Sequence, residues 1–411
     1  MKIAGIIAEY NPFHNGHAYH IEQTKKITGA DRVIVAMSGN FTQRGAPAIY
    51  DKYSRTLAAL NAGADLVIQI PSVYSLSSAE FFGKAAVSLL DSTGLVEYLS
   101  FGTEAGDLEN ISKVADILYE EPEKYQRSLK QYLKSGETFP VARTRALMEY
   151  CPEIVNISEI VASPNNILGI EYLKALKAIG SSMKPMTVKR LGADHNDHYM
   201  HGGTNVSAKA IREAVSYGSQ IESLSEYMND VSYTSLIGAI ENNQTVFEND
   251  LSGMMIYKLI SEREKGYTKY FDVSEDLSDR IVNNLDKFTC LTEFCDLLKT
   301  RDKTYTRISR ALFHILLGIT DESISSAEYS GMCKYIRILG FRKESEDVIS
   351  ELKTHSSLPL ITGYNDAKNL YSEQFKDYVS ECRIEDLYYA VQTMKSGIPS
   401  KADASRPLVV I

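Results

Sequence analysis

The sequence predicts an α/β fold, in which a parallel sheet with helices on both faces is followed by a mainly α-helical C-terminal domain. Two observations lead to this prediction. Short, continuous apolar runs alternate with segments of helical period over the first half of the chain, as in strands buried on both faces and joined by crossover helices. Beyond residue 216 the pattern changes to consecutive amphipathic segments. With 411 residues, of which 44% are hydrophobic, the chain can build two or three domains with substantial cores.

The first domain is predicted to span residues 1–216. Its strands are expected at 2–8, 32–37, 65–70, 97–101 and 186–191, and its helices at 17–29, 50–63, 77–93 and 164–180. The last of these helices begins with Pro164 and ends at Gly180, residues that favour these two positions. A polar, helical insertion at about 106–150 interrupts the alternation of strands and helices.

The second domain is predicted to span residues 217–411. Its amphipathic segments include residues 232–243, 249–264 and 305–319. Two short strands are expected at 333–339 and 358–362, with a helix between them. The second domain is therefore expected to be largely helical.

Charge and cysteine content narrow the class of protein. The 44 Lys and Arg residues against 53 Asp and Glu give a net charge of −9, so contact with nucleic acid needs a local basic patch. The five cysteines form no CxxC pair, which argues against a disulfide framework and a structural zinc site. The apolar run at the N-terminus is too short to span a membrane. We expect a cytoplasmic protein that does not contact membranes.

The motif NPFHNGH at 11–17 follows the first strand and begins the first helix. His14 and His17 are three residues apart, so in a turn leading into a helix both rings face the same ligand. Gly16 permits close approach of a phosphate or base, and the N–H groups of a helix start favour anions. The alternative is a pair of histidines that cap the helix or lie on the surface.

A group of carboxylates and imidazoles follows the fifth predicted strand, at Asp194, His195, Asp197, His198 and His201. These side chains are ligands of transition metals, but the spacing does not place three of them on one helix face. The segment is typical of a loop at the substrate crevice of an α/β sheet. We therefore predict no transition-metal site.

Several longer strings carry a resemblance to a known family. They are IIAEYNPFHNGH (6–17), MSGNFTQRG (37–45), FGTE (101–104), SPNNILGIEYLKAL (163–176) and KRLGADHND (189–197). The predicted strand followed by HxGH resembles the signature of the nucleotidyltransferase and class I aminoacyl-tRNA synthetase superfamily. Together the strings resemble the bacterial tRNA(Met) cytidine acetate ligase family over nearly the whole chain.

The resemblance implies a Rossmann-like nucleotidyltransferase domain and a ligase reaction. ATP activates acetate to acetyl-adenylate, and the acetyl group is transferred to N4 of the wobble cytidine of elongator tRNA(Met), with AMP and pyrophosphate released. Acetyl-coenzyme A takes no part, and Mg²⁺ is expected with the triphosphate. His14 and His17 are expected to be catalytic, because negative charge grows on the phosphate oxygens during adenylyl transfer.

The ATP site of the family is carried over residue by residue, and an assignment to Asn166 in place of its neighbour Asn165 stays open. A simple turn glycine at 102 and a helix-start asparagine at 165 are the alternatives to ligand contact. The expected ATP-binding residues are Ile7, Ala8, Glu9, Tyr10, Asn11, Pro12, Phe13, His14, Asn15, Gly16, His17, Ala18, Tyr19, His20, Gly102, Asn165 and Arg190.

Two further groups are expected to hold phosphate or another part of the substrates. Gln43 and Arg44 follow the second strand, and the alternative for them is a solvated turn. Ser207, Lys209 and Arg212 lie in VSAKAIR, which resembles a phosphate motif of related nucleotidyltransferases except at Ala208. The alternative for this second group is an ordinary amphipathic helix.

Two basic runs in the C-terminal domain are expected to bind the tRNA, and Tyr305 or Tyr335 is expected to stack on an unpaired base. The alternative is a solvated basic face. The residues are Arg301, Lys303, Arg307 and Arg310 in the first run and Lys334, Arg337, Arg342 and Lys343 in the second.

Two other functions stay open on the sequence alone. A small-molecule adenylyltransferase needs only the HxGH domain, and leaves about 200 C-terminal residues without a role. A tRNA-binding protein with a degenerate nucleotide site is a member of another functional class, and the intact His14, Gly16 and His17 argue against it.

Overall fold

A central sheet organises the molecule, whose computed structural model describes residues 1–104, 106–190, 206–330 and 332–411. The strands run in the order β10-β8-β5-β2-β1-β6-β7, and β9 pairs with β8. Their bounds are β1 (Ile3–Ala8), β2 (Arg32–Ser38), β5 (Leu66–Ile70), β6 (Tyr98–Thr103), β7 (Lys184–Lys189), β8 (Ile336–Phe341), β9 (Leu360–Ile361) and β10 (Val409–Val410). A separate hairpin joins β3 (Phe41–Thr42) to β4 (Ala46–Pro47).

The predicted parallel sheet is confirmed. Strands β5, β2, β1, β6 and β7 lie side by side and all pair in parallel. Alternate residues of β1 point to opposite faces: Ile3 and Ile7 join one buried cluster, whereas Ala4 and Ile6 join another. Both faces are thus covered, which explains why these strands read as continuous apolar runs.

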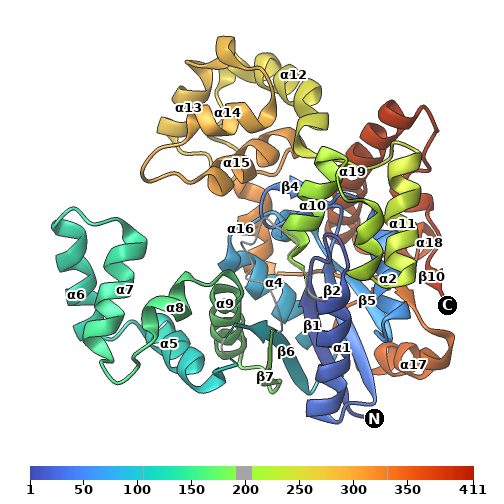
Figure 1. Cartoon of the computed structure of the whole chain (residues 1–411), viewed down its shortest axis with the longest axis horizontal. Coiled ribbons are helices and arrows are strands. Elements are labelled where there is room, and N and C mark those ends of the chain that lie inside the picture. The colour runs from blue at the N-terminus through green and yellow to red at the C-terminus, as the bar shows by residue number, and fades with distance from the viewer. Residues whose placement is uncertain (105, 191–205, 331) are drawn as a thin grey trace.

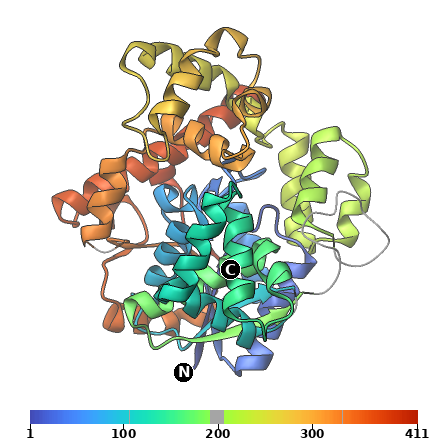
Figure 2. The same cartoon turned by 90° about the vertical axis from the view of Figure 1, so that its left-hand side faces the viewer.

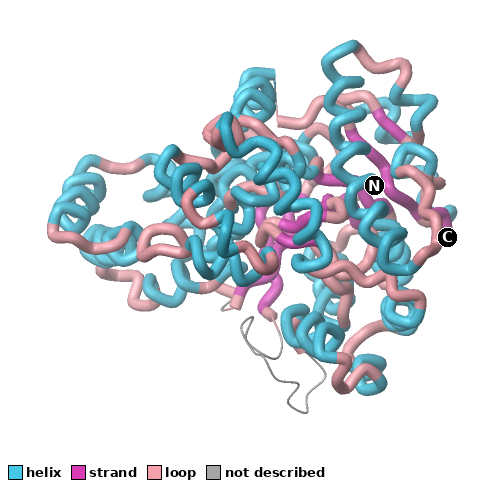
Figure 3. The backbone as a smooth tube through the Cα atoms, turned by 90° about the horizontal axis from the view of Figure 1, so that it is seen from above, coloured by secondary structure: helices cyan, strands magenta, loops and turns pink. Residues whose placement is uncertain are grey.

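Helices cover the two faces of the sheet (Figures 1 and 3). One face packs against α4 (Ala79–Asp91) and α9 (Pro164–Ile179), and also against α17 (Glu346–His355). The other face packs against α1 (Asn15–Thr28) and α2 (Lys52–Asn61). Short α3 (Ser72–Ser75) follows β5. The four helices predicted for the first domain are thus all present.

The predicted insertion is also helical. It consists of α5 (Leu108–Glu120), α6 (Glu123–Lys134), α7 (Phe139–Tyr150) and the shorter α8 (Ile157–Ala162). Helix α8 precedes α9 in the chain and packs against it. These helices share a buried cluster of their own around Ile111, Leu147 and Ile157. In Figure 1 they extend from the sheet at the lower left, and in Figure 2 they face the viewer.

The later half of the chain is mainly helical. Helices α12 (Ser252–Glu262), α13 (Glu275–Val282), α14 (Leu291–Leu298) and α15 (Tyr305–Leu317) form a layer with a core around Leu312 and Phe294 (Figure 1). Helices α10 (Ala208–Tyr217) and α11 (Asp230–Glu241) form a smaller unit. The remaining helices are α16 (Asp321–Ser330), α18 (Tyr364–Ala367) and the long α19 (Ser372–Ser396). In the described part of the chain, no helix combines the length and apolar character needed to cross a bilayer.

The sheet takes strands from both sides of the predicted division at residue 216. The two strands expected near 333–339 and 358–362 form as β8 and β9, with α17 between them. Strand β8 lies antiparallel beside β5, and its other edge pairs with β9 and β10. The two halves of the chain therefore share one sheet, while the division into functional domains stays a prediction.

A buried polar cluster joins α19 and the C-terminal segment to this sheet. Lys52, at the start of α2, pairs with Asp403 at 2.8 Å and with Glu385 of α19 at 3.5 Å. Gln69 of β5 donates from Nε2 to Oε1 of Glu381 at 2.6 Å. Because these groups are buried, each depends on its partners to offset the loss of water.

Candidate functional site

A cavity of about 1250 Å³ lies at the carboxyl ends of the parallel strands. Its lining comes from the loops after β1, β2, β6 and β7, from α9 and α10, and from residues of the C-terminal helical layer such as Tyr305. Ligands of doubly wound sheets bind at this edge, where neighbouring connections leave on opposite faces. The cavity is therefore the candidate site.

His14 and His17 cap the first turn of α1. The Gly16 N–H donates to Nδ1 of His14 at 3.1 Å, and the His14 N–H donates to Nδ1 of His17 at 3.2 Å. The two rings stack with centroids 3.8 Å apart, and both line the cavity. Since each Nδ1 accepts a hydrogen bond, a neutral ring carries its proton on Nε2, which makes Nε2 the donor.

Gly16 has a steric role that the sequence did not reveal. A Cβ atom at this position would lie 2.9 Å from Cε1 of His14, closer than real contacts allow. The absent side chain therefore makes room for the His14 ring itself, in addition to the expected approach of a ligand. The HxGH spacing thus holds one histidine against the helix start.

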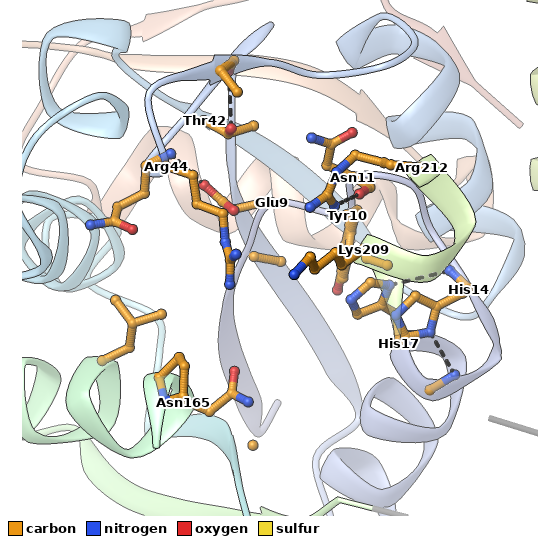
Figure 4. A pocket seen from close by; sticks show the side chains of 18 of the residues that line it. Glu9, Tyr10, Asn11, His14, His17, Thr42, Arg44, Asn165, Lys209 and Arg212 are labelled. Carbon is orange, nitrogen blue, oxygen red and sulfur yellow. Dashed lines mark hydrogen bonds between the residues drawn. The ribbon is translucent and has the colours of Figure 1, made fainter. Parts of the chain in front are cut away.

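Three cationic side chains from two elements converge on the cavity (Figure 4). Arg44 comes from the hairpin between β3 and β4, and Lys209 and Arg212 come from α10, which Ser207 caps by accepting from Ala210 N–H. Arg212 donates from Nη1 to the carbonyl of Asn11 at 2.6 Å. Burial, and then the charge of Arg44, lower the pKa of Arg212. Two guanidinium groups in one cavity, one of which lowers the pKa of the other, favour a bound anion.

The loop that carries Gln43 and Arg44 is held from two sides. Oε1 of Glu9 accepts from the Gln43 N–H at 2.6 Å, at the end of β1. On the other side, Ser309 of α15 donates to the carbonyl of Gly45 at 2.6 Å. Gly45 has a φ of +74°, and a Cβ there would lie 2.6 Å from the Arg310 nitrogen. The C-terminal helical layer therefore fixes the position of Arg44.

The cavity is also lined by Gly102, Asn165, Arg190 and His20. Asn165 donates from Nδ2 to Oε1 of Glu104 at 2.7 Å, and its neighbour Asn166 is buried outside the lining. His20 Nε2 lies 3.1 Å from the Ser100 hydroxyl. Burial, and then the charge of Arg190, lower the pKa of His20 to about 4, so this imidazole is neutral near pH 7.

The cavity brings together most of the predicted nucleotide residues. The predicted residues outside the lining are Pro12, Phe13, Asn15, Ala18 and Ser207. Phe13 is buried in the core, and the side chain of Asn15 donates to the carbonyl of Glu226. Those that line the cavity are Ile7, Ala8, Glu9, Tyr10, Asn11, His14, Gly16, His17, Tyr19, His20, Gln43, Arg44, Gly102, Asn165, Arg190, Lys209 and Arg212.

The predicted basic runs do not form one face. Arg337 is only 6% exposed and pairs with Asp403 at 2.6 Å, so the prediction that it belongs to an RNA-binding surface is wrong. Lys334 pairs with Asp377, Lys303 pairs with Asp276, and Arg310 lies 3.8 Å from Asp272. Periodicity revealed the helix of the first run but not these acidic partners, which come from other segments.

Arg301 and Arg307 are exposed, as predicted for a basic surface. Arg301 also donates to the carbonyl of Gly136 in the insertion, at 3.2 Å. Arg342 and Lys343 follow β8, which runs antiparallel to β5, so they lie at the edge of the sheet away from the cavity. Among the aromatic candidates, Tyr305 lines the cavity, whereas Tyr335 is buried in the core.

The predicted loop with Asp194, His195, Asp197, His198 and His201 lies outside the described residues. Within the ranges that are described, no group of three or more His, Cys, Asp or Glu side chains is arranged to hold a metal ion. Sequence reasoning missed five lining residues of the predicted second domain, 217–411, because nothing local marks them. They are Phe247, Glu248, Asp296, Thr306 and the α10 residue Tyr217.

Comparisons with known proteins agree with this geometry. The profile of the family described as HIGH Nucleotidyl Transferase matches residues 1–402. A tRNA(Met) cytidine acetate ligase of Acetivibrio thermocellus is 41% identical over 373 residues, which cover 89% of each chain. One from Thermoanaerobacter sp. (strain X514) is 42% identical over 392 residues, covering 94% of this chain and 95% of the relative.

Solved structures are similar over the full length of both chains. The apo form of Thermotoga maritima TmcAL superposes with a TM-score of 0.91 at 30% sequence identity. The same protein bound with alpha-thio ATP gives a TM-score of 0.89, also at 30% identity. The likeness covers the sheet, the insertion and the C-terminal helical layer together.

Proposed function

The chain belongs to the HIGH nucleotidyl transferase family, and on that premise we propose that it acts as an ATP-dependent tRNA(Met) cytidine acetate ligase. Its cavity holds ATP and acetate, and then the wobble cytidine of elongator tRNA(Met). The observation that carries the proposal is the capped His14–His17 pair facing three converging cations in one cavity. A tRNA substrate also assigns the enzyme to the cytoplasm.

The first step forms acetyl-adenylate. A carboxylate oxygen of acetate attacks the α-phosphorus of ATP, and pyrophosphate leaves. Negative charge moves toward the leaving phosphates, where preorganised donors lower the barrier most. His14 and His17 donate from Nε2, while Lys209, Arg212 and Arg44 offset the charge. Arg190 holds phosphate through its planar guanidinium, while Asn165 and Gly102 border the nucleoside.

The second step transfers the acetyl group. N4 of the cytosine attacks the acetyl carbon, the bond from that carbon to the phosphate oxygen breaks, and AMP leaves. The acetyl donor is the adenylate, so no acetyl-coenzyme A is required. The free carboxylate is not reactive enough for this transfer, which is why the chemistry begins with ATP.

Mg²⁺ with the triphosphate fits the side chains present. The phosphates supply most ligands to this ion, and one or two protein carboxylates suffice. Glu9 and Glu213 line the cavity and would serve. When bound, the ion would neutralise charge on the phosphates.

Pyrophosphate exchange into ATP tests the proposal. We expect exchange that requires acetate, and N4-acetylcytidine in elongator tRNA(Met) incubated with ATP and acetate. Exchange that requires a phosphorylated acceptor in place of acetate would indicate a small-molecule adenylyltransferase. No exchange, together with retained tRNA binding, would indicate a binding protein.

A further inference from the structure

The cavity has a second wall that the nucleotide does not need. At about 1250 Å³ it exceeds the 300–1,000 Å³ that is usual for a site with one small ligand. Beyond the cations of α10, it is lined by Phe247, Glu248, Asp296, Tyr305 and Thr306. These residues belong to the C-terminal half, whereas the nucleotide residues lie before residue 213. The second wall is thus placed for a second reactant.

Hydrogen bonds tie this wall to the nucleotide loop. The Val246 N–H donates to the carbonyl of Ile49 at 3.1 Å, and the Ile49 N–H donates to Oδ1 of Asn11 at 2.9 Å. Asn11 also accepts from Arg212 through its carbonyl. Next to Val246, the Phe247 N–H donates to Asp250 and closes the turn that contains Glu248. Glu248 is therefore held in a fixed relation to the HxGH loop.

The carboxylate of Glu248 influences charged and aromatic groups of both walls. After burial and Arg44, its carboxylate is the next influence on the pKa of Arg212, which it raises. Burial, then Cys295 and then Glu248, raise the pKa of Tyr305. Tyr305 packs partly buried on the helical core and lines the cavity. A carboxylate, a phosphate-binding cation and an aromatic ring thus line the same cavity.

We propose that Glu248 and Tyr305 form the acceptor-base site, in which Glu248 binds the exocyclic amine of cytosine and takes its proton. This inference rests on the proposed ligase function. A carboxylate is the usual acceptor for cytosine N4, and aromatic side chains stack on unpaired bases of RNA. Tyr305 stacks on the pyrimidine, and the carboxylate distinguishes an amine from the carbonyl oxygen that uracil carries at the same position.

The proton balance explains why the carboxylate matters. As N4 attacks, a bond forms from nitrogen to the acetyl carbon, and the bond from that carbon to the phosphate oxygen breaks. AMP takes the electron pair of the broken bond, and the amine loses one proton to Glu248. Asp296 is less suited to this role because it pairs with Lys299 at 2.9 Å. Glu9 already accepts the Gln43 N–H.

The test compares two rates in the full-length protein: acetate-dependent pyrophosphate exchange and acetyl transfer to tRNA(Met). In Glu248→Gln, we expect the ratio of transfer to exchange to fall by about 100-fold or more, the usual contribution of a general base. The KM for tRNA should stay within about threefold, because the glutamine carbonyl still accepts from the amine. Glu248→Ala should raise this KM as well.

Matched variants complete the test. Glu241→Gln changes an exposed glutamate outside the cavity, and Tyr257→Leu is the control for Tyr305→Leu, which should raise the KM for tRNA. A Glu248→Gln ratio within threefold of wild type would overturn the acceptor-base site alone. A wild-type protein without acetate-dependent exchange would overturn the proposed function, and this inference with it.

Discussion

The Nδ1 atoms of His14 and His17 accept the backbone N–H groups of the first turn of α1, so one pair of side chains both caps the helix and presents donors. A substitution of either histidine therefore combines two effects. The loss of an N-cap costs about 1 kcal/mol, whereas the loss of a donor to developing charge costs about 3 kcal/mol in the transition state. The two effects are separable because asparagine also caps helices.

We expect His14→Asn to keep the free energy of unfolding and to lose acetate-dependent exchange by about 100-fold or more. His14→Ala should lose both, with about 1 kcal/mol of stability. Urea unfolding and pyrophosphate exchange measure the two effects. An asparagine variant that exchanges within threefold of wild type would show that His14 serves only as a cap.

At the scale of elements, α19 contributes two neighbouring carboxylates to the buried cluster. Glu381 accepts from Gln69 and from the backbone and hydroxyl of Ser72, and Glu385 accepts from the Asn40 N–H. Burial, and then the charge of Glu385, raise the pKa of Glu381 to about 8. The folded state therefore holds a proton here that the unfolded chain releases near pH 4.5.

This difference predicts how stability depends on pH. A carboxyl group with a raised folded-state pKa stabilises the fold below its unfolded pKa, and the contribution is lost as pH rises through the folded value. As pH rises from 5 to 8, ionisation of Glu381 should lower the free energy of unfolding by up to about 1.4 kcal/mol per pH unit. Urea unfolding should show a shallower pH dependence in Glu381→Gln, whereas Glu373→Gln, exposed on the same helix, should match wild type. Equal slopes in all three proteins would contradict this role.

Local patterns predicted most elements, because burial on one face gives a periodic apolar pattern and burial on both faces gives a continuous apolar run. The runs at 2–8 and 65–70 and the helix at 164–180 formed within a few residues of their expected bounds. The place of β8 beside β5 was not predictable in this way, since pairing across more than 260 residues leaves no local signal.

Site residues, too, were predicted where a local motif marks them and missed where only the tertiary fold brings them into the cavity. His14, His17 and Arg190 belong to contiguous motifs and line the cavity as expected. Glu248 belongs to no motif, and only the tertiary fold brings it there. The predicted RNA-binding role of Arg337 was wrong, because its basic neighbours suggested an exposed surface. Its acidic partner Asp403, which lies 66 residues away, could not be recognised from the local sequence.

At the scale of the whole molecule, the basic residues predicted to bind tRNA lie in two separate places. Arg301 and Arg307 belong to the helical layer that borders the cavity, whereas Arg342 and Lys343 lie at the far edge of the sheet. This difference supplies a matched control for the predicted tRNA contacts.

Replacing Arg301 and Arg307 with alanine should weaken tRNA binding and lower the slope of log affinity against log salt by about one to two. The same replacement of Arg342 and Lys343 should leave the slope unchanged. Filter binding at several salt concentrations measures both. If the first pair gives the wild-type slope, the tRNA does not follow the helical layer.

The shared sheet also predicts the outcome of truncation. The sequence favours a fragment 1–216 that binds ATP, since the predicted nucleotide contacts all lie within it. The structure favours the opposite result, because the fragment leaves β5 without β8 and Lys52 without Glu385 and Asp403. Loss of partners for a buried charge costs about 3–5 kcal/mol. We expect no cooperative unfolding by circular dichroism and no ATP binding; a folded fragment that binds ATP would support the division at residue 216.

The pairing of β5 with β8 has a consequence for synthesis of the chain. About 265 residues separate the end of β5 from the start of β8. At about 5–20 residues per second, a ribosome needs tens of seconds to produce them. During that time β5, buried along its whole length in the finished protein, has an open edge that invites pairing with other chains. The nascent polypeptide is thus most vulnerable to aggregation between these two moments, and a chaperone that protects an apolar strand edge would act there.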